Sequence, residues 1–272
     1  MTPLILANAP NGASRTKADH PALPMTADEI GETAARILDA GAAMIHVHVR
    51  DAAGRHLLDA DAYRAATAAI RARVGQKLVV QVTTEAGGRY EAPAQIRVIR
   101  ALRPEAVSVA LRELFADPKL ETEAADFLGW LRRERIALQM ILYSAEEVHR
   151  YAGLKARGII PAGNDFPLFV LGRYTAGQVS TPADLDPFLA AATEIKLTDP
   201  WSMCAFGQHE NACAAHAASL GGHVRVGFEN NLLLPDGGRA PDNAALVRLA
   251  AQAARAGGRS LATADDARAL TA

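Results

Sequence analysis

Short runs of apolar residues alternate with longer segments of helical periodicity along the whole chain. A short apolar run bounded by turn residues is typical of a strand buried on both faces, and such strands form parallel sheets connected by helices. The pattern predicts eight strands, at Leu4–Asn8, Met44–Val49, Leu78–Thr83, Ala106–Ala110, Ile136–Leu142, Leu168–Leu171, Met203–Phe206 and Val224–Phe228.

The segments between these strands show the period of amphipathic helices. Helices are predicted at Ala27–Ala40, Ala62–Val74, Pro93–Leu102, Glu121–Glu134, Ala145–Lys155, Pro182–Thr193, Glu210–Leu220 and Asn243–Ala256, with a last short one at Ala264–Leu270. Thr26 followed by Glu29 forms a capping box, and Thr181-Pro182 is a helix start with proline in the first turn. The sequence therefore predicts one domain, residues 1–272, folded as an eight-fold β/α barrel, with a doubly wound open sheet as the alternative.

Composition and charge narrow the range of partners. Half of the 272 residues are hydrophobic and the formal net charge is −1, so no strong field favours nucleic acid or an anionic membrane. The expected partner is a small molecule. The start of the chain does not resemble a signal peptide, no window reaches the ~18 apolar residues of a membrane span, and Cys204 and Cys213 lie in an apolar region. We expect a soluble protein in the reducing cytoplasm.

Two histidines stand one residue apart at the end of the second predicted strand. Side chains alternate faces along a strand, so His46 and His48 point the same way, about 6.6 Å apart along the backbone. Two neutral imidazoles side by side on a buried face are difficult to satisfy without a cation between them. The pair is therefore interpreted as two ligands of one metal ion, and a hydrogen-bonded pair of core histidines is the alternative.

The last predicted strand carries a second polar face. Arg225, Gly227 and Glu229 share one face, and strands two and eight lie close together across a barrel mouth. Glu229 is the predicted third ligand of a divalent ion, Zn²⁺, with one open position for water or substrate. The alternative is an internal salt bridge between Arg225 and Glu229. The absence of a side chain at Gly227 favours a bound group in that space.

Several segments together resemble one known family, the β-keto acid cleavage enzymes, whose best-known activity is 3-keto-5-aminohexanoate cleavage. The match extends over nearly the whole chain. Its markers are Asn11-Gly12-Ala13 with Thr16-Lys17-Ala18-Asp19-His20-Pro21, His46-x-His48-x-Arg50-Asp51, Gln81-Val82-Thr83-Thr84, Phe169-Val170-Leu171-Gly172 and Gly221-Gly222-His223-Val224-Arg225-Val226-Gly227-Phe228-Glu229-Asn230-Asn231.

The resemblance implies a zinc-bearing barrel that converts a β-keto acid and acetyl-CoA into acetoacetate and a new acyl-CoA. It implies that His46, His48 and Glu229 bind Zn²⁺, and that Thr83 and Arg225 assist the base. A homotetramer is also implied. The ion would act as a Lewis acid that stabilises enolate and alkoxide charge.

The chain departs from the family pattern at the base, because Asn230 stands where the family has an aspartate. An amide cannot take up a proton at neutral pH. We predict that Glu85 serves instead, or that Asn230 only orients the substrate in an altered reaction. The fourth strand, with Ser108, also departs from the family, and Gln139–Leu142 lacks the acid that amine-substrate members carry. An aminated keto acid is therefore predicted to be a poor substrate.

Further substrate contacts are expected at Asn11, Ser108, Gly87 and Gly88. The run Gly87-Gly88-Arg89 is interpreted either as a phosphate contact for CoA or as a plain loop. Two other functions remain open. A metal-dependent hydrolase on the same barrel would need further inward histidines, for which the middle of the chain offers only His56 and His149. A catalytically altered protein that binds a metal or a carboxylate is the third possibility.

Overall fold

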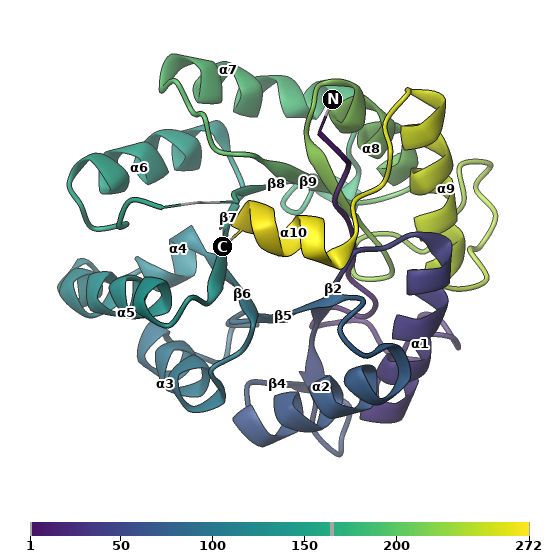
Figure 1. Ribbon diagram of the computed structural model, residues 1–272, viewed down its shortest axis with the longest axis horizontal. Helices are drawn as coiled ribbons and strands as arrows, with labels where there is room; N and C mark the ends of the chain where they lie inside the picture. Colours follow the sequence, from purple (N-terminus) through teal and green to yellow (C-terminus); the bar gives the residue numbers. More distant parts are fainter. Residues whose placement is uncertain (1, 164–165, 272) are drawn as a thin grey trace.

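A closed barrel of eight parallel strands forms the centre of the protein (Figure 1). The structure, a computed structural model, describes residues 2–163 and 166–271. The strands pair in the order β1-β10-β9-β8-β7-β6-β5-β2, which confirms the predicted eight-fold β/α barrel. Their bounds are β1 Leu6–Asn8, β2 Met44–Val47, β5 Val79–Thr83, β6 Ala106–Ala110, β7 Ala137–Leu142, β8 Leu168–Leu171, β9 Ser202–Ala205 and β10 His223–Val226.

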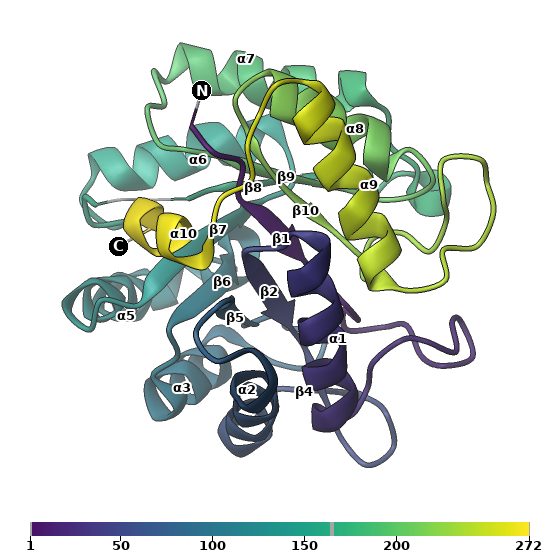
Figure 2. The ribbon, with the colours of Figure 1, turned by 45° about the vertical axis from the view of Figure 1, so that its right-hand side comes forward.

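Helices surround the barrel, as the two ribbon views show (Figures 1 and 2). The predicted capping box of Thr26 and Glu29 is present at the start of α1. The helices are α1 Ala27–Ala40, α2 Ala60–Val74, α3 Ala92–Leu102, α4 Leu111–Leu114, α5 Glu121–Arg133, α6 Ala145–Ala156, α7 Asp186–Glu194, α8 Glu210–Ser219, α9 Asn243–Ala256 and α10 Ala264–Thr271, with short 3₁₀ turns η1 Pro118–Leu120, η2 Ala176–Gln178 and η3 Pro182–Leu185. Within the described residues, none of these helices combines the length and the apolar character needed to cross a membrane.

A small hairpin, which the sequence did not predict, follows the second barrel strand. Strand β3 (Val49–Arg50) pairs with β4 (His56–Leu57) in antiparallel fashion. The Asp51 carboxylate accepts hydrogen bonds at 2.9 Å from the backbone N–H groups of Ala53 and Arg55, which closes the turn. Strands of two residues are too short to show a period of their own, so the sequence pattern does not reveal them.

The helix predicted at Pro182–Thr193 is divided in the structure. Residues Pro182–Leu185 form the 3₁₀ turn η3, and α7 begins only at Asp186. Pro187 follows at the start of α7 and has no N–H to donate to the preceding turn, so a continuous helix cannot form across this point.

The predicted last strand also ends earlier than expected, at Val226 rather than Phe228. Gly227 has a φ of +141°, and a Cβ at this position would lie 2.5 Å from the Ala9 carbonyl oxygen. The chain therefore turns here at close range to β1, and the Glu229 N–H donates to the Ala9 carbonyl at 3.0 Å. As a result, Glu229 sits in the loop that follows the strand.

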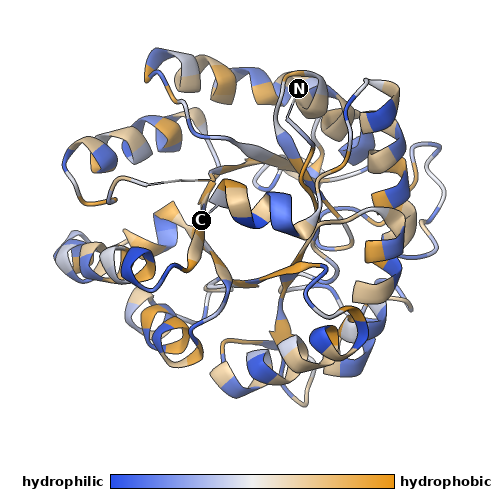
Figure 3. Ribbon diagram, in the orientation of Figure 1, coloured by the Kyte–Doolittle hydropathy of each residue, from blue (hydrophilic) through white to orange (hydrophobic). Residues whose placement is uncertain are grey.

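The two ends of the barrel differ. Helix α10 lies across the end where the strands begin (Figure 1), and Ala264 and Ala267 on it pack with Ile5, Met44 and Val79 in one apolar cluster. Apolar residues follow the strands and the inner sides of the helices (Figure 3). Because this end is closed, the carboxyl ends of the strands are left to form a site, as in other β/α barrels.

Candidate functional site

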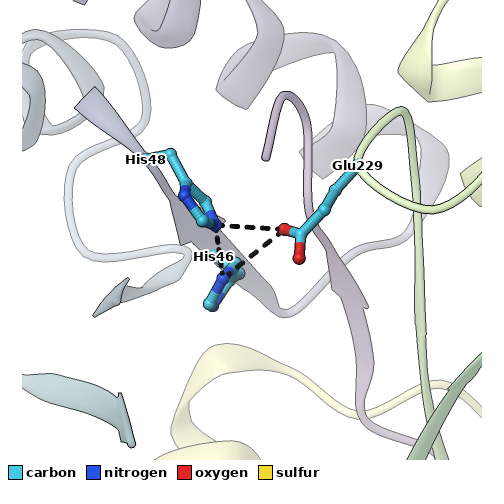
Figure 4. A group of neighbouring side chains, drawn as sticks. All are labelled: His46, His48 and Glu229. Carbon is cyan, nitrogen blue, oxygen red and sulfur yellow. Dashed lines mark hydrogen bonds and ion pairs between the residues drawn. The ribbon is translucent and has the colours of Figure 1, made fainter. Parts of the chain in front are cut away.

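The two histidines of the second strand face each other at the carboxyl end of the barrel (Figure 4). His46 lies in β2 and His48 follows its last residue, and both side chains are buried. Their Nε2 atoms are 3.1 Å apart. The alternating faces of the strand therefore bring the two imidazoles together, as predicted.

Hydrogen bonds around the imidazoles fix their orientation. The Nδ1 of His46 lies 2.8 Å from Gln81 Oε1, which accepts a hydrogen bond from the Nδ1–H group and leaves the Nε2 lone pair of His46 free. Burial lowers the pKa of His46 to about 3, so the ring is neutral. The amide of Asn11 donates to the His48 carbonyl at 3.0 Å and holds that part of the backbone. A neutral imidazole with a fixed tautomer is the form that binds a metal.

Glu229 completes the group from the loop after β10 (Figure 4). Its Oε2 lies 3.2 Å from His48 Nε2 and 3.5 Å from His46 Nε2. Its Oε1 lies 3.1 Å from an Arg225 nitrogen. The internal salt bridge and the three-residue group therefore coexist. Burial alone would raise the pKa of Glu229, but the Arg225 guanidinium holds it well below its usual range.

The geometry of His46, His48 and Glu229 fits a single metal ion. Four donors arranged as a tetrahedron at the Zn–N and Zn–O distances of about 2.0–2.1 Å lie about 3.3 Å from one another. The three distances between ligand atoms here are 3.1, 3.2 and 3.5 Å. Two nitrogens and one carboxylate oxygen form the ligand set of catalytic sites that keep one position open.

A cavity opens beside this group, with an empty volume of about 570 Å³ that includes solvent at its mouth. It brings together Asn11, Thr83, Glu85 and Arg225, all of which were singled out in the sequence. Two nitrogens of Arg225, Nε and Nη1, are buried without a hydrogen-bond partner among the described residues. The remaining lining residues are Gly12, Ala13, Ser14, Arg15, His46, Ala110, Ile141, Tyr143, Val170, Arg173, Phe206 and Glu229.

Glu85 lies next to the histidines. Its Oε2 is 3.7 Å from His48 Nε2, and its Oε1 is 3.8 Å from a nitrogen of Arg173. The Glu85 N–H donates to the Thr83 hydroxyl at 3.0 Å, and the Glu85 carbonyl lies 2.7 Å from His56 Nε2. Thr83 and His56 therefore hold the backbone that carries this carboxylate.

Other residues singled out in the sequence lie outside the cavity lining. Asn230 is fully buried, and neither side-chain atom of its amide has a hydrogen-bond partner among the described residues. Ser108 is also fully buried, in the middle of β6. Gly87 lines a neighbouring groove, and Gly88 lines neither that groove nor the cavity.

The loop that carries Glu229 is braced by Arg15 and Glu210. The Arg15 guanidinium donates to the Phe228 carbonyl. The Glu210 carboxyl group accepts from the Gly227 N–H at 3.0 Å and from the Asn231 amide at 3.3 Å. Burial raises the pKa of Glu210 to about 8, so this carboxyl group is largely protonated at neutral pH.

Two cavity residues, Arg15 and Tyr143, were missed in the sequence. Tyr143 directly follows β7, so its place at a strand end was a usable signal. Its ring lies 5.3 Å from that of Tyr174, and the Arg112 guanidinium stands 4.5 Å above it. Burial raises the pKa of the Tyr143 phenol well above its usual range, so it remains a protonated donor.

Comparisons with known proteins agree with this picture. The family model described as beta-keto acid cleavage enzyme matches residues 3–272. The chain is 29% identical to a "3-keto-5-aminohexanoate cleavage enzyme" of Fusobacterium nucleatum, with 98% of this chain and 97% of the relative covered. It is 28% identical to a "3-oxoadipate:acetyl-CoA acetyltransferase" of Cupriavidus necator, with 98% and 94% covered.

Among solved structures, the chain is similar in fold to the apo structure of ObcA. The TM-score is 0.75 and the identity is 17%, over 92% of this chain and 65% of that one. At this identity the likeness supports the barrel fold alone.

The contact between Gly12 and Glu229 gives a test of the site. Gly12 has a φ of +65°, and a Cβ there would lie 2.6 Å from the Glu229 Cγ. We predict that Gly12→Ala displaces Glu229 and weakens Zn²⁺ binding about 10- to 100-fold in a metal titration. Gly158→Ala is the matched control, because Gly158 has a φ of +72° with nothing within 4 Å and adds only backbone strain. Equal Zn²⁺ affinity in both variants would contradict the prediction.

Proposed function

The chain belongs to the beta-keto acid cleavage enzyme family, and on this premise we propose that it is a zinc-dependent transferase acting on a β-keto acid and acetyl-CoA. The products would be acetoacetate and a new acyl-CoA. The observation that carries the proposal is the triangle formed by His46, His48 and Glu229 next to the unpartnered nitrogens of Arg225. Acetyl-CoA as co-substrate is supported by relatives that are named for it, such as the 3-oxoadipate:acetyl-CoA acetyltransferase of Cupriavidus necator.

In this proposal His46, His48 and Glu229 would hold the zinc. When bound, the zinc would act as a Lewis acid that polarises the keto group of the substrate. Arg225 would donate to the substrate carboxylate from Nη1, which has no hydrogen-bond partner among the described residues. Its Nη2 stays on Glu229. A guanidinium suits this task because it stays charged and its donors are held in one plane.

Glu85 would act as the base. Its carboxylate lies in the same cavity, 3.7 Å from His48 Nε2. It would take a proton from the carbon between the keto and carboxylate groups, and the resulting carbanion would attack the acetyl thioester and expel the CoA thiolate. The thiolate would then attack the original keto carbon. Cleavage of the carbon–carbon bond would release acyl-CoA and the enolate of acetoacetate, to which Glu85 returns its proton.

The walls of the cavity favour an apolar acyl chain on the substrate. Ala110, Ile141, Val170 and Phe206 line one side. Glu85 and Glu229 are the only carboxylates among the described lining residues, and both have roles in the proposal. No further anion is left to pair with an ammonium group.

The proposal also covers assembly and compartment. The family resemblance implies a homotetramer, and we keep that state as part of the proposal. Cys204 and Cys213 are free and buried, and this is consistent with a reducing cytoplasm. Burial raises the pKa of the Cys204 thiol to about 11, so it stays protonated and does not compete as a nucleophile.

A pair of isosteric variants separates metal binding from proton transfer. We predict that Glu229→Gln weakens Zn²⁺ binding by more than about 100-fold, because one of three ligands loses its charge. Glu85→Gln should keep the zinc and lower kcat by about 10²- to 10⁴-fold, the range for loss of a general base. Elemental analysis and acetoacetate release from acetyl-CoA measure the two effects.

Each variant is the control for the other in this experiment. Zinc retained in full by Glu229→Gln would contradict the ligand assignment. Unchanged turnover in Glu85→Gln, or loss of its zinc, would contradict the role of Glu85 as base.

The substrate proposal predicts a preference between matched compounds. A β-keto acid with a short unbranched chain should exceed its amino-substituted analogue in kcat/KM by about 100-fold, since an ammonium unpaired against apolar walls costs about 3 kcal/mol. A hydroxyl-substituted analogue of the same length is the control, because it adds a polar group without a charge. Faster turnover of the amine would contradict the proposed substrate class.

Asn230→Asp tests the alternative that this site has lost its activity. Because the Asn230 side chain is fully buried and outside the cavity lining, we predict that an aspartate there does not raise turnover. The wild-type protein should already release acetoacetate, and thermal unfolding should show a lower stability in the variant, since it buries an added carboxyl group. Activity found in the variant alone would support the catalytically altered alternative.

A further inference from the structure

A second groove opens next to the metal cavity. The two share Ala13, Ser14, Glu85 and Arg173 in their linings. The groove continues from Thr16 in the loop after β1 along the β3–β4 hairpin and the loop after β5. Its lining residues there are Arg50, Ala53, Gly54, Arg55, His56, Gly87 and Arg89. We call this surface the arginine groove.

The arginine groove carries a positive charge although the protein as a whole does not. Four guanidinium groups line it, those of Arg50, Arg55, Arg89 and Arg173, against the carboxylate of Glu85 in the lining and that of Asp51, which pairs with Arg55. The formal net charge of the whole chain is −1. Such a local concentration of arginine on a nearly neutral protein is typical of a site for an anionic ligand.

Two of these arginines, Arg50 and Arg173, contact groups that form the metal cavity. Arg50 donates to the backbone carbonyls of Gly12, Ala13 and Arg15, and this ties the hairpin to the loop after β1. Arg173 lies 3.8 Å from Glu85. These two arginines are therefore needed to shape the cavity.

Arg55 and Arg89 are the exposed pair. The Arg55 side chain is 69% exposed, with its Nε 2.8 Å from Asp51. Arg89 is exposed, donates to the His56 carbonyl at 2.6 Å and has its guanidinium 5.5 Å from the centre of the Tyr90 ring. An exposed guanidinium with one donor fixed keeps others free for a ligand, and its orientation is already set.

Glycine keeps the loop close to the hairpin. Gly87 has a φ of +54°, and a Cβ there would lie 2.8 Å from the ring of His56. Gly88, at a φ of +70°, has nothing within 4 Å of such a Cβ. The backbone of this loop therefore passes beside β4 and leaves the groove open, which places Arg89 on its edge.

We infer that the arginine groove binds the phosphate-bearing arm of coenzyme A, with Arg55 and Arg89 pairing with its phosphates. This inference rests on the proposed function. The shared residues of the two linings would let the thioester end reach Glu85 while the charged end stays among the arginines. Guanidinium groups bind phosphate oxygens in pairs, and this geometry selects phosphate over a simple negative charge.

The inference is tested by binding, without turnover. Calorimetry would compare the affinities of the zinc-loaded protein for CoA and for pantetheine, which lacks the phosphates. We expect Arg55→Ala and Arg89→Ala each to weaken CoA binding about tenfold, the loss of one charge-assisted hydrogen bond, and to leave pantetheine binding unchanged. Arg89→Lys should recover only part of the loss. Arg157→Ala is the matched control. Arg157 is likewise exposed, at 59%, and is paired with a carboxylate, that of Glu121, but it lies at the C-terminus of α6 and does not line the groove.

The outcomes separate this inference from the proposed function. Weaker CoA binding in both groove variants supports the groove even if no β-keto acid is turned over. Normal acetoacetate release with unchanged CoA affinity in both variants would overturn the groove and leave the reaction in place. Equal losses in Arg157→Ala, or equal affinity of the wild type for CoA and pantetheine, would also overturn it.

Discussion

The structure depends on the close approach of two buried imidazoles and one buried carboxylate. Their ligand atoms lie 3.1 to 3.5 Å apart, a distance that suits one shared cation. Much of the surrounding chain serves this approach: Gln81 orients His46, and Arg225 lies against the outer oxygen of Glu229. Glu210 stabilises the turn by accepting a hydrogen bond from the Gly227 N–H. Helix α10 closes the opposite end of the barrel, so the three ligand residues lie at the end that is open to solvent.

Most of the fold could be predicted because parallel strands buried on both faces leave continuous apolar runs in the sequence. The run Val79–Thr83 is one such strand, confirmed in the barrel. The hairpin of β3 and β4 could not be predicted, since two-residue strands carry no period and their pairing depends on the Asp51 turn. Pro187 divides a helix that periodicity alone makes continuous.

The site was predictable where one local rule decides the geometry. Alternation along a strand places His46 and His48 together, whatever the rest of the fold does. Glu229 was predicted on a strand face, yet it reaches the histidines from a turn at Gly227, whose backbone packs on Ala9. Arg15 could not be predicted, because it reaches the cavity through a long loop and a contact with a distant carbonyl. Such contacts depend on the tertiary structure and leave no local pattern.

Anomalous X-ray diffraction at the zinc edge tests the central claim most directly. Crystals of the purified protein should give one anomalous peak per chain, about 2.0 to 2.2 Å from His46 Nε2, His48 Nε2 and a Glu229 oxygen. The fourth coordination position of the zinc should face the cavity. A structure without that peak, in which Glu229 pairs only with Arg225 and the two imidazoles hydrogen-bond to each other, would contradict the account.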